Sequence, residues 1–175
     1  MEFRNVYFGA MHRTGKQERI IAMKEKKKYY LAYGSNLNIN QMAYRCPTAK
    51  PVGTAVIKGY EILYKGSKSG AYLTIEQNPD SFVPVAVWEV TEFDEKNLDR
   101  YEGFPDFYYK KQVSIQICKM NGRRQKVDAF VYIMHESREL GIPSEHYVRV
   151  CAEGYRNFGF DLEILKAAYI KSKNA

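Results

Sequence analysis

Two features of the sequence could carry chemistry, and the first is a short loop that contains a glycine. The loop YGSNL comprises Tyr33, Gly34, Ser35, Asn36 and Leu37 and follows an aromatic and aliphatic run, so it lies at the end of a predicted strand. Successive backbone amides in such a turn can hold a carboxylate or an oxyanion, and a glycine lets the backbone approach a ligand closely. The loop therefore predicts a binding site for a negatively charged group.

The second feature is Glu102, a candidate acid or base at the end of the predicted helix LDRYEG. The helix macrodipole disfavours a carboxylate at this end, and neighbouring aromatic residues, including Tyr101 and Tyr108, exclude water. Both effects predict a raised pKa, which suits proton transfer near neutral pH. The alternative is that Glu102 lies on an exposed turn and has no chemical role.

Two other kinds of site are disfavoured by the sequence. Ser35 is not in a GxSxG motif, and no spacing links it to His135 or His146 as a base. Those two histidines are also too far apart for a helical metal-binding pair. Four acidic residues are expected on the exposed face of a helix: Glu92, Asp94, Glu95 and Asp99. We therefore expect neither a Ser–His mechanism nor a metal site.

Strands dominate the part of the chain that must position the loop. One strand precedes the loop, and a short helix follows it and stops at Pro47. Residues 52–64, 71–78 and 83–90 are rich in Val, Ile, Tyr and Thr and predict three strands, separated by turns at GSKSG and NPDS.

Helices and a hairpin follow. Thr91 and Asp94 resemble a capping box, which opens a helix that ends at Gly103. Asn121-Gly122 favours a type I′ hairpin between two alternating strands. Two further helices are predicted, from SEHYVRVCAEGYRNFG and from DLEILKAAYIKS. Six strands broken by helices predict an α+β domain whose sheet closes or nearly closes.

The positive charge is concentrated at the N-terminus. Of the net charge of +7, residues 1–28 carry +5 from eight basic and three acidic residues, and the rest carries +2. We expect residues 1–28 to form a loosely structured basic extension and residues 29–175 to form the domain. A basic arm attracts RNA through counterion release, so an RNA-associated protein is an alternative, although the balanced domain disfavours a nucleic-acid partner.

The composition bounds the class of protein. With 175 residues, 45% of them hydrophobic, the chain is long enough for one packed domain. No apolar run reaches the roughly 18 residues of a membrane helix, and the first residues lack a secretory signal, so we expect a cytoplasmic protein without a membrane partner. Cys46, Cys118 and Cys151 are far apart and form no CxxC motif, so we expect them to be packing residues.

Four segments together resemble the γ-glutamylcyclotransferase family, also called AIG2-like. They are YYLAYGSNL, LDRYEGFPDFY, AFVYIM and PSEHYVRVCAEGYRNFG, in this order, and the resemblance spans about residues 29–168. It implies a small mixed β-barrel of about six strands with helices packed around it. It also implies an enzyme that cyclises a γ-glutamyl amide to 5-oxoproline and releases the amine, without metal or cofactor.

The resemblance also implies roles for particular residues. Glu102 would be the catalytic acid and base, and the YGSNL loop would bind the γ-glutamyl group of a small-molecule substrate. Tyr108 and Tyr132 would face the site. The form YGSNL is more similar to the branch acting on γ-glutamyl-amino acids than to the YGTL form of the γ-glutamylamine branch. A catalytically silent binding module of the same fold is a further alternative, and the oligomeric state stays open.

Overall fold

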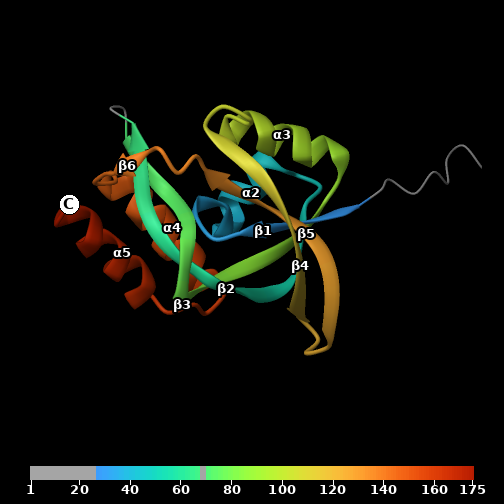
Figure 1. Cartoon of the computed structure of the whole chain (residues 1–175). Helices are drawn as coiled ribbons and strands as arrows, with labels where there is room; N and C mark the ends of the chain where they lie inside the picture. Colours follow the sequence, from blue (N-terminus) through green and yellow to red (C-terminus); the bar gives the residue numbers. More distant parts are fainter. Residues whose placement is uncertain (1–26, 68–69) are drawn as a thin grey trace, which may run out of the picture.

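Six strands are present in the part of the chain that the computed structural model describes, residues 27–67 and 70–175 (Figure 1). They are β1 (Lys28–Ala32), β2 (Lys50–Ser67), β3 (Gly70–Val90), β4 (Tyr108–Lys119), β5 (Arg124–Met134) and β6 (Glu139–Leu140). Residues 1–26 of the predicted basic extension lie outside the described residues, so the extension stays a prediction.

Five of the strands close into a mixed barrel. The order is β3-β1-β5-β4-β2-β6, and the additional pairing of β3 with β2 closes the sheet. Strands β1 and β5 run parallel, whereas the other pairs are antiparallel. The short strand β6 adds to β2 through Lys65 and Gly66. The prediction of a small mixed barrel is therefore confirmed.

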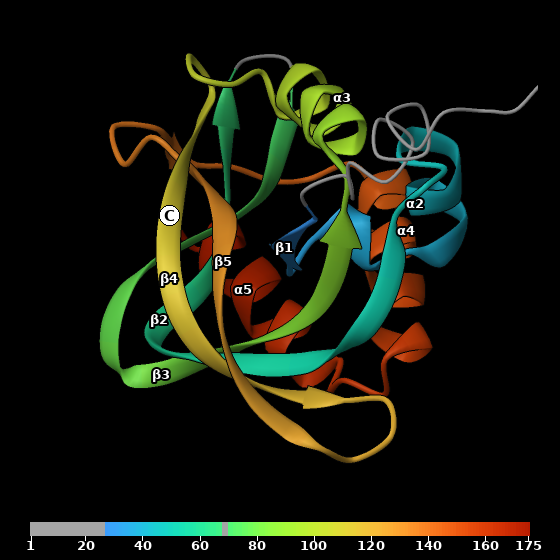
Figure 2. The same ribbon diagram turned by 90° about the vertical axis from the view of Figure 1, so that its right-hand side faces the viewer.

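The predicted turn at NPDS is wrong, because β3 runs through it without reversing. Lys58 of β2 pairs with Phe82, whereas Tyr60 pairs with Gln77, so the NPDS segment forms a bulge. Gly59, which lies opposite in β2, has φ +75°, a value that favours glycine. Figure 2 shows β2 and β3 bending together at this level. The turn-forming residues thus bend two paired strands, which helps the sheet to close.

The hairpin between β4 and β5 forms where it was predicted, but with a different turn. The Lys119 N–H donates to the Arg123 carbonyl, and the Gly122 N–H donates to the Lys119 carbonyl. Only glycines have positive φ among the described residues, so Asn121 is not left-handed, whereas Gly122 has φ +78°. The loop therefore has three residues with glycine in the left-handed position, instead of a type I′ pair.

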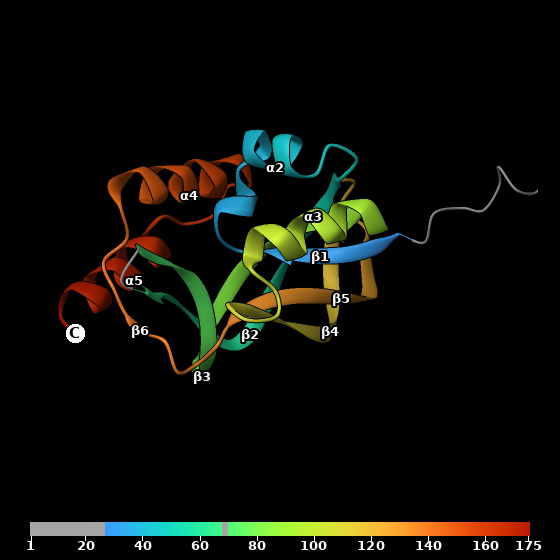
Figure 3. The same ribbon diagram turned by 90° about the horizontal axis from the view of Figure 1, so that it is seen from above.

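Helices cover the barrel on two sides, as Figure 3 shows. After the short 3₁₀ helix η1 (Ser35–Leu37) come α2 (Ile39–Arg45), α3 (Glu92–Glu102), α4 (Glu145–Asn157) and α5 (Glu163–Lys173). Helix α4 packs on η1, and α5 packs on β2. No described helix is long and apolar enough to cross a membrane.

Helix α3 begins and ends as predicted. Thr91 and Asp94 form the reciprocal capping box, and Gly103 closes the helix in the left-handed conformation with φ +62°. The expectation of an exposed acidic face is wrong for Asp94, which is fully buried because it caps the helix, and for Glu95, whose side chain is only 12% exposed and pairs with Lys28 and Lys110. Of the cysteines, Cys46 and Cys151 are buried as expected, whereas Cys118 is exposed and is not a packing residue.

Candidate active site

The glycine loop and the end of α3 meet at one pocket of about 470 Å³. Asn36 and Glu102 are 66 positions apart in the sequence, yet the Asn36 Nδ2 donates a hydrogen bond to the Glu102 Oε1 over 2.8 Å. Tyr33 at the end of β1, Tyr108 of β4 and Tyr132 of β5 line the same pocket. The closed barrel therefore brings together a carboxylate, a turn and three tyrosines.

Glu102 faces this pocket, and burial governs its titration. Its side chain is half-buried and lines the pocket wall, so it does not lie on an exposed turn. Loss of hydration raises the pKa of Glu102 to about 7, and the Arg45 charge and the Asn36 hydrogen bond oppose this rise. Only Oε1 has a hydrogen-bond partner among the described residues. The other oxygen is open to a ligand in the pocket.

Arg45 at the end of α2 holds the loop side chains in one orientation. Its Nη1 donates to the Asn36 Oδ1 over 2.6 Å and to the Ser35 Oγ over 3.1 Å. The guanidinium stacks on the ring of Tyr101, 3.6 Å from the centroid. Because the Asn36 oxygen faces Arg45, its NH₂ group must face the other way, toward Glu102 and the Tyr30 hydroxyl.

The turn itself offers backbone donors. The N–H groups of Leu37 and Asn38 donate to the carbonyls of Gly34 and Ser35, which closes the 3₁₀ turn. The preceding N–H groups, of Gly34, Ser35 and Asn36, have no acceptor among the described residues, as is usual at the start of a helix. These three residues line the pocket, so their donors are available to an anionic or carbonyl oxygen.

Gly34 keeps the floor of the pocket open. Its φ of −115° is outside the left-handed region that favours glycine, so the surrounding space is what makes the absence of a side chain important here. A Cβ atom at this position would lie 3.4 Å from the Tyr147 hydroxyl and 3.5 Å from the Leu73 Cβ. Tyr147 and Leu73 line the pocket as well, so any larger side chain would enter the space that a ligand needs.

The three predicted tyrosines form the wall of the pocket, and their hydroxyl groups are engaged. Tyr33 donates to the Tyr132 carbonyl over 2.7 Å, Tyr132 to the Asp99 Oδ1 over 2.6 Å, and Tyr108 to the Leu73 carbonyl over 2.8 Å. Burial raises the pKa of each of them above the ordinary tyrosine value. They are neutral at physiological pH, so Glu102 is the only one of these groups that titrates near neutrality.

Leu37 does not line the pocket, which corrects its assignment to the binding loop. Its side chain is fully buried, and it lies against Gly154 of α4, where an added Cβ would come within 2.6 Å of the Leu37 Cβ. Ser35 is in the pocket. Among the described residues, the side chains of Arg45 and Tyr101 contact its hydroxyl, and no histidine does. Leu37 thus anchors the loop rather than contacting a ligand.

Several residues of the pocket could not be identified from sequence patterns. Arg45 is in a different helix from Glu102, and its position beside Asn36 depends on how α2 folds back over the loop. Tyr147 was expected only as part of the apolar stripe of α4. Arg138 lies in the connection between β5 and β6, for which no element was predicted. These three residues have in common that tertiary packing alone brings them to the site.

Comparisons with known proteins agree on one family. The family model described as "Gamma-glutamyl cyclotransferase, AIG2-like" matches residues 30–149, more than half of the chain. The human protein named gamma-glutamylcyclotransferase is 25% identical over 146 residues, which cover 79% of this chain and 76% of the human protein. The bovine protein of the same name is 26% identical over 144 residues, covering 78% and 74% of the two chains.

Solved structures share the fold. A structure described as "Gamma-glutamyl cyclotransferase" has a TM-score of 0.69 and 23% identity, and covers 82% of this chain and 86% of its own. An uncharacterized human protein, loc79017, has a TM-score of 0.67 and 24% identity, with 82% and 87% covered. These likenesses extend over most of the chain, including the barrel that holds the pocket.

Proposed function

Because this chain belongs to the gamma-glutamyl cyclotransferase, AIG2-like family, we propose that it cyclises a γ-glutamyl amide to 5-oxoproline and releases the amine. Glu102 is the acid and base in this proposal, and the turn at Gly34, Ser35 and Asn36 holds the γ-glutamyl group. The observation that carries it is the hydrogen bond from Asn36 to Glu102, because it sets a carboxyl group of raised pKa directly beside unpaired amides.

Proton transfer is the role of Glu102. The substrate's α-ammonium group must lose a proton before its nitrogen can attack the γ-carbonyl carbon. Over the whole reaction that nitrogen gives up two protons and forms a C–N bond, while the departing nitrogen loses its bond to carbon and takes up two. A carboxyl group with a pKa of about 7 is half ionised at neutral pH, so it can accept and return protons and finish in its starting state.

Binding geometry supplies the rest of the catalysis. The nucleophile belongs to the substrate itself, so the pocket has only to fold the glutamyl chain into a conformation in which nitrogen and carbonyl carbon are close. The amides of Gly34, Ser35 and Asn36 then stabilise the oxygen that becomes negative during attack. Arg45 contributes through Asn36 and is a positioning residue in this scheme.

The test is a product assay on the full chain. We expect γ-glutamyl-alanine to yield equal amounts of 5-oxoproline and alanine, and Glu102→Gln to lower kcat by about a hundredfold to ten-thousandfold, the range for a general acid or base. Binding of the substrate to Glu102→Gln, measured by calorimetry, should persist. If γ-glutamyl compounds bind to the unaltered protein without any release of 5-oxoproline, the silent binding module is the better description.

A further inference from the structure

Arg138 is a cationic side chain in the wall of the pocket that contains Glu102. It lies in the turn between β5 and β6, where its N–H donates to the His135 carbonyl over 3.1 Å. Its guanidinium carbon lies 4.7 Å from the centroid of the Phe107 ring, and the side chain is half-buried. Stacking on an aromatic ring restrains the guanidinium without using its N–H donors.

The guanidinium of Arg138 has no hydrogen-bond or ion-pair partner among the described residues, in contrast to the charged groups of Arg45 and Lys110. Within residues 27–67 and 70–175, no hydrogen bond or ion pair involves its guanidinium. Arg45 donates hydrogen bonds to the side chains of Ser35, Asn36 and Gln41. Lys110 is paired with the carboxylates of Glu95 and Asp99. A partly buried guanidinium with five free donors is an available site for a carboxylate.

The position of Arg138 is close to the end of α3 that carries Glu102. Phe107, on which Arg138 stacks, donates its N–H to the Gly103 carbonyl over 2.8 Å. A Cβ at Gly103 would lie only 3.1 Å from the Phe107 Cβ, so Phe107 packs closely on the end of the helix. Arg138 is therefore separated from the catalytic end of α3 by one aromatic residue.

We propose that Arg138 binds the carboxylate of the amino acid attached to the γ-glutamyl group, and so determines specificity for γ-glutamyl-amino acids over γ-glutamylamines. This inference rests on the function proposed above. In that function the loop amides and Glu102 engage the glutamyl half of the substrate, which contains the reacting atoms. The other half must extend along the pocket, and the fork of a guanidinium matches a carboxylate with two parallel hydrogen bonds.

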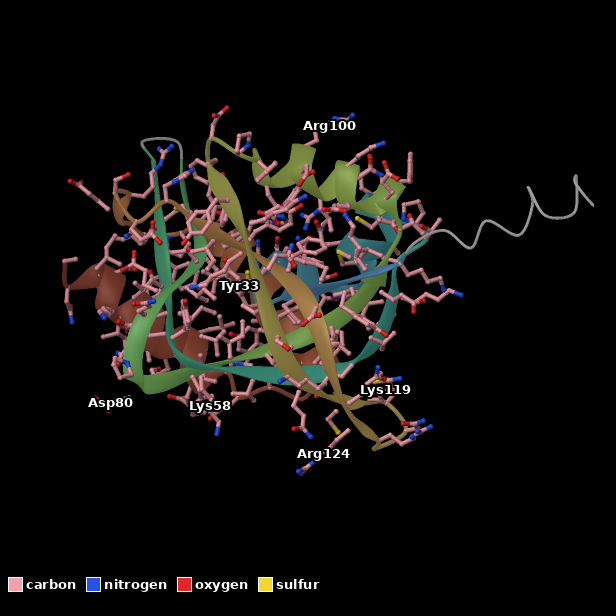
Figure 4. All side chains as sticks on the ribbon, turned by 45° about the vertical axis from the view of Figure 1, so that its right-hand side comes forward. Tyr33, Lys58, Asp80, Arg100, Lys119 and Arg124 are labelled. Carbon is pink, nitrogen blue, oxygen red and sulfur yellow. The ribbon has the colours of Figure 1, made fainter. Side chains whose placement is uncertain are left out.

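Arg100 is the competing candidate, because it also lines the pocket. Its side chain is exposed, and Figure 4 shows it at the outer edge of α3, whereas Tyr33 lies inside the molecule. An exposed arginine is strongly hydrated, so exchanging its water for a carboxylate contributes little. The half-buried Arg138 discriminates better between a charged and a neutral substrate.

The experiment compares two substrates that differ in one group, γ-glutamyl-alanine and the neutral γ-glutamyl-alaninamide. The quantity measured is the ratio of their kcat/KM values, with 5-oxoproline as the product detected. We expect Arg138→Gln to lower this ratio by about tenfold to a hundredfold, the effect of removing a hydrogen bond to a charged group. The loss should appear on γ-glutamyl-alanine alone and mainly in KM.

Three variants make the result specific. Arg138→Lys keeps the charge without the planar fork, so it should lower the ratio less than Arg138→Gln. Arg156→Gln removes one exposed positive charge from the end of α4, where the residue does not line the pocket, and should leave the ratio unchanged. Arg100→Gln tests the competing candidate directly. Unchanged turnover of γ-glutamyl-alaninamide demonstrates that each variant is folded.

The outcomes separate this inference from the proposed function. If the unaltered protein releases 5-oxoproline from neither substrate, nor from other γ-glutamyl amides, the proposed function itself fails. If it turns over both substrates and Arg138→Gln lowers kcat/KM equally for the two, Arg138 does not bind the carboxylate of the attached amino acid. A fall in the ratio with Arg100→Gln but not with Arg138→Gln would likewise overturn the assignment. A selective loss with Arg138→Gln alone supports it.

Discussion

Two carboxylates at opposite ends of α3, Asp94 and Glu102, are both removed from bulk water, but their surroundings differ. Asp94 is fully buried in the first turn, where its Oδ2 accepts hydrogen bonds from the Thr91 N–H over 3.0 Å, the Thr91 hydroxyl over 2.9 Å and the Thr48 hydroxyl over 2.5 Å. Glu102 is in the last turn and accepts one hydrogen bond, from Asn36.

The difference shows that burial by itself does not make an acid or base. The helix N-terminus and three donors stabilise the negative charge of Asp94, so that this carboxylate serves the structure. Glu102 is at the opposite end of the helix and accepts one hydrogen bond from the described residues, so desolvation raises its pKa to about 7. The same residue class is structural at one end of the helix and a candidate for catalysis at the other.

The largest effect should be a loss of stability when the N-terminal cap of α3 is removed. Asp94→Ala removes the cap and leaves the buried donors of Thr91 and Thr48 without an acceptor, so we expect the free energy of unfolding to fall by about 2–4 kcal/mol. Urea unfolding measures this loss. Activity per folded molecule should remain; an inactive variant of normal stability would show that Asp94 contributes to the site.

At the other end of α3, we expect the position of the Glu102 carboxylate to affect activity more than it affects the stability of the protein. Glu102→Asp keeps the charge but withdraws the carboxylate by about one bond length, away from Asn36, so we expect kcat for γ-glutamyl-alanine to fall by about a hundredfold. Steady-state kinetics and a urea unfolding curve on the same sample test this. Near-normal turnover would mean that the exact placement of the carboxylate is unimportant.

Ionisation of Glu102 should also lower the free energy of unfolding as the pH rises. Its pKa of about 7 in the folded protein exceeds the ordinary value of 4.5, so the folded state binds more protons between these values and its stability falls over that range. Glu102→Gln lacks this titration. Above pH 7 we expect it to be more stable than the unaltered protein by on the order of 2 kcal/mol, and below pH 4 the two should differ little.

Thermal unfolding at several pH values tests that prediction. Asp94→Asn is the matched control for a buried carboxylate, since replacing a well-hydrogen-bonded anion should destabilise the protein. A stability difference between Glu102→Gln and the unaltered protein that does not change with pH would contradict the raised pKa.

The smallest effect should come from Arg45, because its replacement changes the surroundings of Glu102 and leaves the carboxyl group itself in place. Its charge lowers the pKa of Glu102, so Arg45→Gln should raise that pKa further and move the acidic limb of the kcat/KM profile to higher pH. We expect activity at pH 7 to fall about two- to fivefold and to recover largely above pH 8. Arg45→Lys, which keeps the charge, should shift the limb less.

The interpretation of that pH profile requires that no other group around Glu102 titrates in the same range. The surrounding groups are five tyrosines and one cysteine, all with a raised pKa: Tyr30, Tyr33, Tyr108, Tyr132, Tyr147 and Cys46. Each is neutral near pH 7, so the acidic limb should report Glu102 alone. A loss of activity in Arg45→Gln that is the same at every pH would assign Arg45 a purely structural role.

Local features were predictable where neighbours in the sequence decide the structure. The capping box at Thr91 and the left-handed Gly103 follow from contacts within a few residues, and both are present as predicted. The NPDS segment shows the limit of this reasoning. Its residues favour a turn, but pairing with β2 on both sides of the segment holds β3 in one strand. The short strand β6 likewise depends on a distant element, because it pairs with β2.

Sequence patterns alone identify the candidate groups and the local conformations that present them: an acid at the end of a helix and a glycine turn after a strand. Whether these groups meet was decided by barrel closure, which joins positions 66 residues apart through the Asn36–Glu102 hydrogen bond. The same holds for Arg45, Tyr147 and Arg138. Capping depends on hydrogen bonds along one segment, whereas a pocket needs side chains from several elements, and only the folded chain specifies which ones face each other.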